Sequence, residues 1–192
     1  MKFLNYLTED EKMPDIVRLI KRDCKPWLST ISSLIGTGKC FIRHVTMKNY
    51  VTNITKFTPR TDREPRDSSQ KLHDLVDNEL FKKFNWKPRS EGVFVWPVKK
   101  ISSLDVFDGL YNVFYPIGEF KYVWSPKIKD LFNLQLQVLK SPDEYIKSYT
   151  NKNLLKTFKG QLNFGQEVMF KCDSYYLVNA KFIGLLKENK LL

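Results

Sequence analysis

Hydrophobic and polar positions along the chain alternate in a way that predicts helices followed by short strands. Residues 8–25 carry apolar side chains at helical spacing behind an acidic start, and residues 27–35 continue as a second helical segment. Residues 39–45 are rich in β-branched and aromatic side chains and are typical of a strand. This strand should hold Arg43 near the core. Residues 46–57 fit either a second strand or an irregular connection.

The middle of the chain places a helix before a buried strand. Residues 67–69 offer a helix cap, and the apolar stripe after them predicts a helix that ends at residues 85–88. Residues 92–96 are continuously apolar, so we expect them inside a sheet. Residues 107–115 and 119–124 predict two short strands, because the Pro-Ile-Gly sequence between them favours a turn.

The last third of the chain returns from helices to strands. Residues 127–139 and 141–149 are predicted as helices, the second because Ser-Pro-Asp-Glu puts proline at the first helical position. Residues 165–171 and 175–183 predict two strands joined by a polar turn. The whole pattern predicts an α+β fold with a mostly antiparallel or mixed sheet.

Length and composition favour one folded domain. A chain of 192 residues can bury a sizeable core, and 42% hydrophobic with 14% aromatic residues argues against disorder. We expect a single domain over residues 1–192, in which residues 1–36 form a helical segment packed on the α+β core.

Cysteine spacing and hydropathy indicate an intracellular protein. Cys24, Cys40 and Cys172 lie far apart without a CxxC motif, so they are expected to be buried thiols and neither metal ligands nor disulfide partners. No apolar run is long enough to cross a bilayer, and the acidic residues near the start do not fit a signal peptide. We expect a soluble, cytoplasmic protein without a membrane partner.

Net charge points to an anionic partner. Lysine and arginine outnumber aspartate and glutamate by 32 to 21, which gives a net charge of +11 and would attract nucleic acid or another polyanion. Much of the excess is lysine spread along the chain, which is equally compatible with a lysine-rich proteome.

Residues 58–97 concentrate the side chains that best hold anions. Guanidinium groups beside prolines are suited to phosphate or carboxylate in a fixed geometry, whereas a face built for solubility would favour Lys and Glu. Four arginines and one of the two histidines of the chain fall in this block: Arg60, Arg63, Arg66, Arg89 and His73.

Each of these side chains also has a structural interpretation. Arg63 and Arg66 alternate with acidic residues and could neutralise their own loop. His73 has Asp77 one helical turn later, off the apolar stripe, and could be hydrogen-bonded to it. Arg43 could pair with an acidic neighbour as an ordinary strand arginine.

Three elements then follow one another in a recognisable order. Arg43 lies on an early strand, CFIRHV, residues 92–96 form an apolar strand, and Glu167 opens a late strand in GQEVMFKCDSYYLVN. This order resembles the ADP-ribosyltransferase superfamily, from about residue 23 to the end of the chain. The block around residues 62–90 is also similar to an uncharacterised group of phage-encoded proteins of similar length.

The resemblance implies a fold and a reaction. The fold would be a split mixed or antiparallel sheet flanked by helices, and the cofactor would be NAD. Arg43 would bind the phosphate or ribose side of the dinucleotide, with Arg63 or Arg89 as a second clamp. Glu167 would be the catalytic residue that stabilises the positively charged ribosyl group. A phage-encoded transferase would modify a host protein or nucleic acid in the host cytoplasm. The cofactor-binding residues would be completed by Arg66, His73 and Ser90.

Two departures from the family pattern leave a second function open. Where the family carries Ser-Thr-Ser, this chain reads Phe94-Val-Trp96, and Gly165 stands two positions before Glu167 in place of a Glu or Gln. Glu167 could then simply begin an edge strand. The alternative is a catalytically inactive, basic binding protein that engages nucleic acid or a host defence or transcription protein.

Overall fold

The computed structural model describes residues 9–46, 49, 51–65, 69–98, 110–128, 141–160 and 166–192. In this part of the chain, helices surround one five-stranded sheet whose pairings are all antiparallel. The predicted α+β class is therefore confirmed, and the sheet is antiparallel in the described residues.

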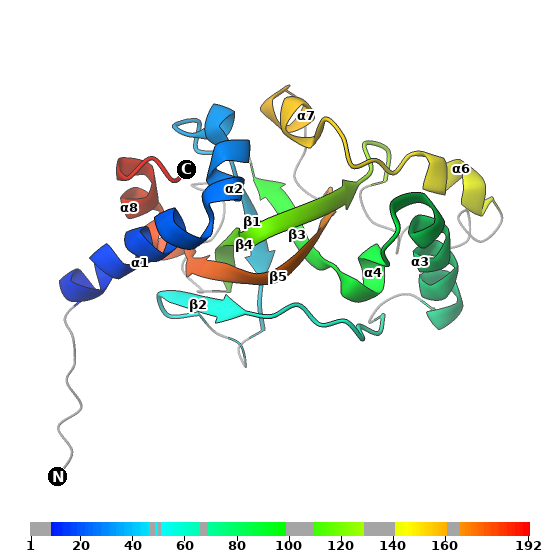
Figure 1. The fold of residues 1–192 in the computed structure, drawn as a ribbon, viewed down its shortest axis with the longest axis horizontal. Helices are drawn as coiled ribbons and strands as arrows, with labels where there is room; N and C mark the ends of the chain where they lie inside the picture. The colour runs from blue at the N-terminus through cyan, green and yellow to red at the C-terminus, as the bar shows by residue number, and fades with distance from the viewer. Residues whose placement is uncertain are drawn as a thin grey trace, which may run out of the picture.

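The elements alternate much as the hydrophobic pattern predicts. The strands are β1 (Cys40–His44), β2 (Ile54–Phe57), β3 (Val93–Val98), β4 (Tyr111–Trp124) and β5 (Val168–Asn179). The helices are α1 (Glu9–Asp23), α2 (Lys25–Thr30), η1 (Ser32–Leu34), α3 (Gln70–Phe84), α4 (Pro88–Glu91), α6 (Pro142–Lys147), α7 (Leu154–Gly160), η6 (Ala180–Phe182) and α8 (Ile183–Glu188). Helices α1, α2 and α8 gather at one end of the sheet, and α3, α4 and α6 gather at the other (Figure 1).

The strands form a closed ring of hydrogen-bonded neighbours. Their order is β2-β5-β3-β1-β4, and β4 also pairs with β5. The ring closes because β4 and β5 are long: β4 pairs with β1 through Tyr111–Val113 and with β5 along most of its length. Strand β2 lies outside the ring, paired with the second half of β5.

Strand β4 corrects the prediction of two short strands at residues 107–115 and 119–124. The Pro-Ile-Gly sequence that predicted a turn forms an irregularity in the ladder between Ile117 and Phe120. Gly118 has a φ of +67°, a conformation that glycine adopts without strain, so the strand passes through it without ending. Residues 107–109 lie outside the described residues.

Strand β5 likewise corrects the prediction of two strands joined by a polar turn. Asp173 and Ser174 do not form a turn, because the pairing of β5 with β4 continues on both sides of Asp173. Cys172 pairs with Phe120, and Ser174 pairs with Ile117. The strand ends at Asn179, whose side chain accepts the Lys181 N–H. Residues 180–183, predicted as strand, begin the helical end of the chain instead.

Local capping signals were more reliable guides. The Ser69 hydroxyl accepts the Leu72 N–H at the start of α3, and Asn85 ends the helix in the left-handed conformation with φ 58°. Pro142 begins α6 as predicted, and residues 54–57 prove to be a strand. Helix α7 was not predicted, and residues 129–139 of the helix predicted over 127–139 lie outside the described residues.

Two hydrophobic clusters fill the space on either side of the sheet. The larger one includes α1, α2 and the ring of strands, and α2 lies directly against β4. The smaller one lies between α3 and the strands, and it includes Phe94 of β3 and Met169 of β5. Phe94 therefore faces α3, and this orientation positions the candidate site.

The three cysteines are free and buried, as predicted. Burial raises the pKa of Cys24 and Cys172 to about 12, and that of Cys40 further above its usual range, so all three are protonated at neutral pH. Among the described residues, no group of His, Cys, Asp and Glu is placed to hold a metal ion. None of the described helices combines the length and the apolar character that crossing a membrane requires.

Gly92 joins α4 to β3 where there is no room for a side chain. A Cβ atom at this position would lie 2.1 Å from the Pro88 carbonyl oxygen. We expect Gly92→Ala to lower the free energy of unfolding by about 1–3 kcal/mol, because the α4 backbone must shift. Urea unfolding measures this change. Gly184→Ala in α8 is the matched control, since a Cβ there meets nothing within 4 Å. Equal urea midpoints for Gly92→Ala and the parent would contradict the prediction.

Candidate functional site: an arginine cluster around Phe94

Three of the predicted cofactor-binding arginines meet at Phe94. The Arg43 Nη1 atom donates a hydrogen bond to the Phe94 carbonyl oxygen at 2.9 Å. The guanidinium carbons of Arg63 and Arg89 lie 4.0 Å and 5.6 Å from the centroid of the Phe94 ring. We call Arg43, Arg63 and Arg89 the arginine cluster. The structure thus brings together residues that are separated by up to 46 positions in the sequence.

Each arginine reaches Phe94 from a different element. Strand β1 pairs with β3 through Ile42 and Trp96, which sets Arg43 beside the start of β3. Arg89 belongs to α4, immediately before β3. Arg63 lies in the segment after β2, and its N–H donates to the Ser90 carbonyl oxygen at 3.4 Å. Backbone pairing therefore fixes the base of each side chain.

Tyr175 and Asn112 extend the polar surroundings of Arg43. The Arg43 guanidinium carbon lies 6.0 Å from the centroid of the Tyr175 ring. Burial raises the pKa of Tyr175, and the positive charges of Arg43 and Arg63 partly offset this. Asn112 lies directly across from Arg43 in the ladder, and its buried Oδ1 atom has no hydrogen-bond partner in the described residues.

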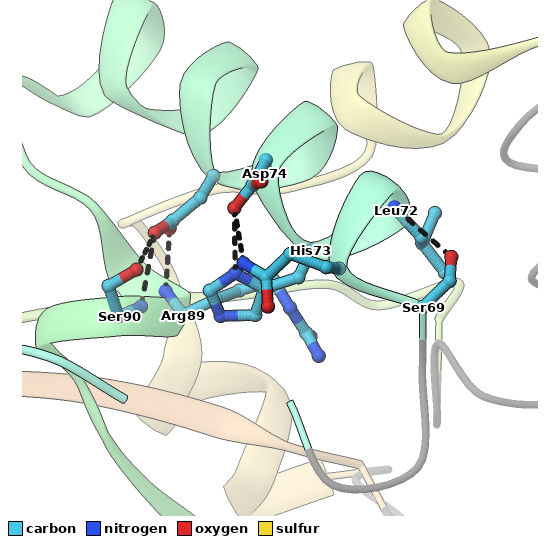
Figure 2. A network of polar contacts seen from close by, with 8 residues as sticks. Ser69, Leu72, His73, Asp74, Arg89 and Ser90 are labelled. Atoms are coloured by element: carbon cyan, nitrogen blue, oxygen red, sulfur yellow. Dashed lines mark hydrogen bonds and ion pairs between the residues drawn. The ribbon is translucent and has the colours of Figure 1, made fainter. Parts of the chain in front are cut away.

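A buried aspartate holds α4 in place. Both carboxylate oxygens of Asp77 accept hydrogen bonds, from the Arg89 N–H at 2.8 Å and from the Ser90 N–H and hydroxyl at 3.1 Å and 2.5 Å (Figure 2). Asp77 is 2% exposed. The Ser90 hydroxyl is therefore engaged as a donor to Asp77, and this carboxylate fixes the backbone from which the Arg89 side chain leaves.

His73 is buried and lacks the partner that its sequence neighbourhood suggested. Its Nδ1 atom lies 3.5 Å from Asp74 Oδ1, so the prediction of an Asp77 partner is wrong. The reason is that Asp77 is engaged by α4. The structure also corrects the placement of His73 and Asp77 off the buried side of α3, since both are buried. Residues four apart share one face of a helix, and here this face packs against α4.

Within the described part of the chain, several buried nitrogens around the cluster have no hydrogen-bond partner: His73 Nε2, Arg89 Nε and Arg89 Nη1. Among the described residues, neither Arg43 nor Arg89 forms an ion pair with a carboxylate. Buried polar groups in folded proteins nearly always have partners, and a buried charge without one is costly. This arrangement is suited to a ligand that brings negatively charged acceptors.

Glu167 is half-buried and directly precedes β5. The strands β1, β3 and β5 are neighbours, so the strand of Arg43 and the strand that follows Glu167 flank β3 on its two sides. The last paired residues of β3 and β5 are Val95 and Val168, which places Glu167 next to the level of Trp96. Strand alternation does not fix its side chain, because Glu167 lies outside the strand. Arg66 and Gly165 lie outside the described residues.

Sequence reasoning found the arginines and missed what organises them. The residue types in the block over 58–97 led us to expect an anion site. The meeting of the arginines at Phe94 and the contact of Arg43 with Tyr175 depend on strand register, which no local sequence motif predicts. The Asp77 bonds to α4 join residues twelve and thirteen positions apart and have no sequence signature of their own.

We compared the chain with protein-family models, with curated proteins and with solved structures. No family model matches it. The curated proteins and the solved structures likewise gave no match. A function for this chain therefore rests on its own side chains and on the way the fold assembles them.

Proposed function

We propose that the protein binds NAD at the arginine cluster, within an ADP-ribosyltransferase-like split sheet, and transfers the ADP-ribosyl group to a host macromolecule. The convergence of Arg43, Arg63 and Arg89 on Phe94 carries this proposal. In this function Arg43 and Arg63 hold the pyrophosphate, and Glu167 is the catalytic carboxylate.

The cluster has the properties that pyrophosphate binding needs. Guanidinium groups form charge-assisted hydrogen bonds with phosphate oxygens, and these bonds are stronger than neutral ones. The bond from Arg43 to the Phe94 carbonyl and the stacking of Arg63 on the Phe94 ring hold both side chains near one geometry before a ligand arrives. Less conformational entropy is then lost on binding.

The transfer of the ADP-ribosyl group requires a carboxylate near the ribose C1′ atom. The bond between the ribose C1′ atom and the nicotinamide nitrogen breaks, and nicotinamide leaves with the bonding electron pair. A nucleophilic oxygen or nitrogen of the acceptor bonds to C1′ and gives its proton to solvent. A carboxylate near C1′ stabilises the positive charge that develops there. The adjacency of β1, β3 and β5 supports Glu167 in this role, because Arg43 on β1 and the residue that directly precedes β5 lie on either side of β3.

Isothermal titration with NAD tests the binding. We expect Arg43→Gln and Arg63→Gln each to weaken NAD binding roughly 10- to 100-fold, since each removes a charged hydrogen-bond donor to phosphate. Arg60→Gln is the matched control: Arg60 lies in the same block but is largely exposed and pairs with Asp62 at 3.2 Å. Thermal unfolding checks that each variant is folded. No heat of binding with the parent, or an equal loss in Arg60→Gln, would overturn the proposal.

Binding without transfer is the second candidate function, with nucleic acid or a host defence or transcription protein as the partner. It is favoured by the side chains of β3, since Phe94 and Trp96 supply no hydroxyl, and the Ser90 hydroxyl is bound to Asp77. The net charge of +11 favours a polyanion. Fluorescence anisotropy with single-stranded oligonucleotides separates the two: affinity that falls steeply with salt, together with no binding of NAD, supports this candidate.

A further inference from the structure

His73 and Arg89 belong to two elements, α3 and α4, that Asp77 ties together. His73 and Asp77 lie four residues apart on α3 and so share its inner face. Asp77 accepts the Arg89 N–H at 2.8 Å, so the Arg89 side chain leaves α4 beside that face. Figure 2 shows the two side chains pointing into the same region beneath α3.

This region offers donors without acceptors. His73 is 3% exposed, and neither its Nε2 atom nor the Nε and Nη1 atoms of Arg89 has a hydrogen-bond partner among the residues that the structure describes. His73 also lies in the first turn of a 15-residue helix, whose N-terminal end carries partial positive charge. The Ser69 hydroxyl accepts the Leu72 N–H there. Burial, charge and helix direction all favour an anion.

The carboxylates nearby are already bonded. Asp77 accepts from the backbone and hydroxyl of α4, and Asp74 accepts from Gln70 at 2.7 Å. Asp74 beside Nδ1 favours a proton on that nitrogen, so Nε2 becomes a donor when the ring carries its second proton. An imidazole donor beside the permanent positive charge of Arg89 suits a phosphomonoester.

We infer that His73 and Arg89 form a second anion subsite, which takes a phosphomonoester group of the ligand. Arg43 and Arg63 remain for the pyrophosphate, in line with the proposed function on which this inference rests. The expected ligand is then a dinucleotide that carries an additional phosphate, such as the 2′-phosphate of NADP. The subsite makes the protein selective between two cofactors that differ only in this group.

Titration with three ligands tests the inference: NAD, NADP and inorganic phosphate. We expect the parent to bind NADP roughly tenfold or more tightly than NAD, from the added charge-assisted hydrogen bonds. Arg89→Gln and His73→Gln should each remove most of this preference while NAD affinity changes less. Arg60→Gln, with its exposed guanidinium group, should keep the preference. Arg89→Lys, which keeps the charge and loses the planar fork, provides a milder variant if a substitution at buried His73 prevents folding.

The outcomes separate this inference from the proposed function. Equal binding of NAD and NADP by the parent overturns the subsite and leaves NAD binding intact. Phosphate binding that is lost in Arg89→Gln, without binding of either dinucleotide, supports the subsite and overturns the proposed function. An NADP preference that survives in both Arg89→Gln and His73→Gln places the extra phosphate elsewhere and overturns the inference.

Discussion

Replacing Phe170 with alanine is expected to lower the free energy of unfolding by about 3–5 kcal/mol. Phe170 is completely buried on β5, at the centre of the larger hydrophobic cluster. Its ring centroid lies between 5.2 and 5.9 Å from those of five other aromatic side chains: Trp27, Phe41, Phe114, Phe120 and Tyr122. Removing the ring leaves a cavity that these neighbours cannot all close at once, because they come from two strands and a helix.

Urea unfolding followed by circular dichroism measures the effect of Phe170→Ala. A loss of this size is a large part of the roughly 5–15 kcal/mol that stabilises a typical domain. Phe81→Ala is the matched control, since Phe81 is 45% exposed on α3 and its removal should change the free energy of unfolding by less than about 0.5 kcal/mol. If both variants unfold at the same urea concentration, the aromatic cluster does not stabilise the fold as described.

Replacing Glu167 with glutamine is expected to slow ADP-ribosyl transfer about 100-fold or more, with little change in NAD affinity. Glutamine keeps the shape of the side chain and removes the negative charge that the developing positive charge at C1′ requires. Losing one electrostatic contact of this kind costs about 10²- to 10³-fold in rate in other enzymes. Incorporation of labelled NAD into a cell extract, together with calorimetry, measures rate and affinity separately.

The control for Glu167→Gln is Glu119→Gln, which removes the charge of an exposed glutamate on β4. The parent and Glu119→Gln should label the same acceptors at similar rates. Labelling by Glu167→Gln at the parental rate would remove Glu167 from the mechanism. A parent that binds NAD but labels nothing would assign the protein to binding without transfer.

Local chemistry allowed part of the fold to be predicted from the sequence. Some features depend only on residues that are close together in the sequence, and the sequence alone identifies these. They are the helix caps at Ser69 and Asn85 and the apolar run of β3. The apparent breaks in β4 and β5 are different. Proline, glycine and polar residues favour turns when the backbone has no strand to pair with. Here β4 and β5 pair with each other on both sides of these residues, so each strand continues.

The sequence likewise indicated some residues of the candidate site but not how the fold brings them together. Residue type made Arg63 and Arg89 anion-binding candidates, and the family resemblance added Arg43. Their meeting point was not predictable, because it depends on the pairing of β1 with β3 across more than fifty residues. The partner of His73 was misjudged because Asp77, one helical turn away, is engaged by the α4 backbone.

The ring of strands has a consequence for behaviour in solution. Each of β1, β3, β4 and β5 pairs with a described strand on both sides over part of its length, whereas β2 pairs on one side only. Open edges are where sheets of separate molecules join and begin to aggregate. Strand β2 has only four residues, and Lys56 within it is exposed. A short edge with a charged side chain is a poor template for intermolecular pairing, so ring closure protects the chain against aggregation through its sheet.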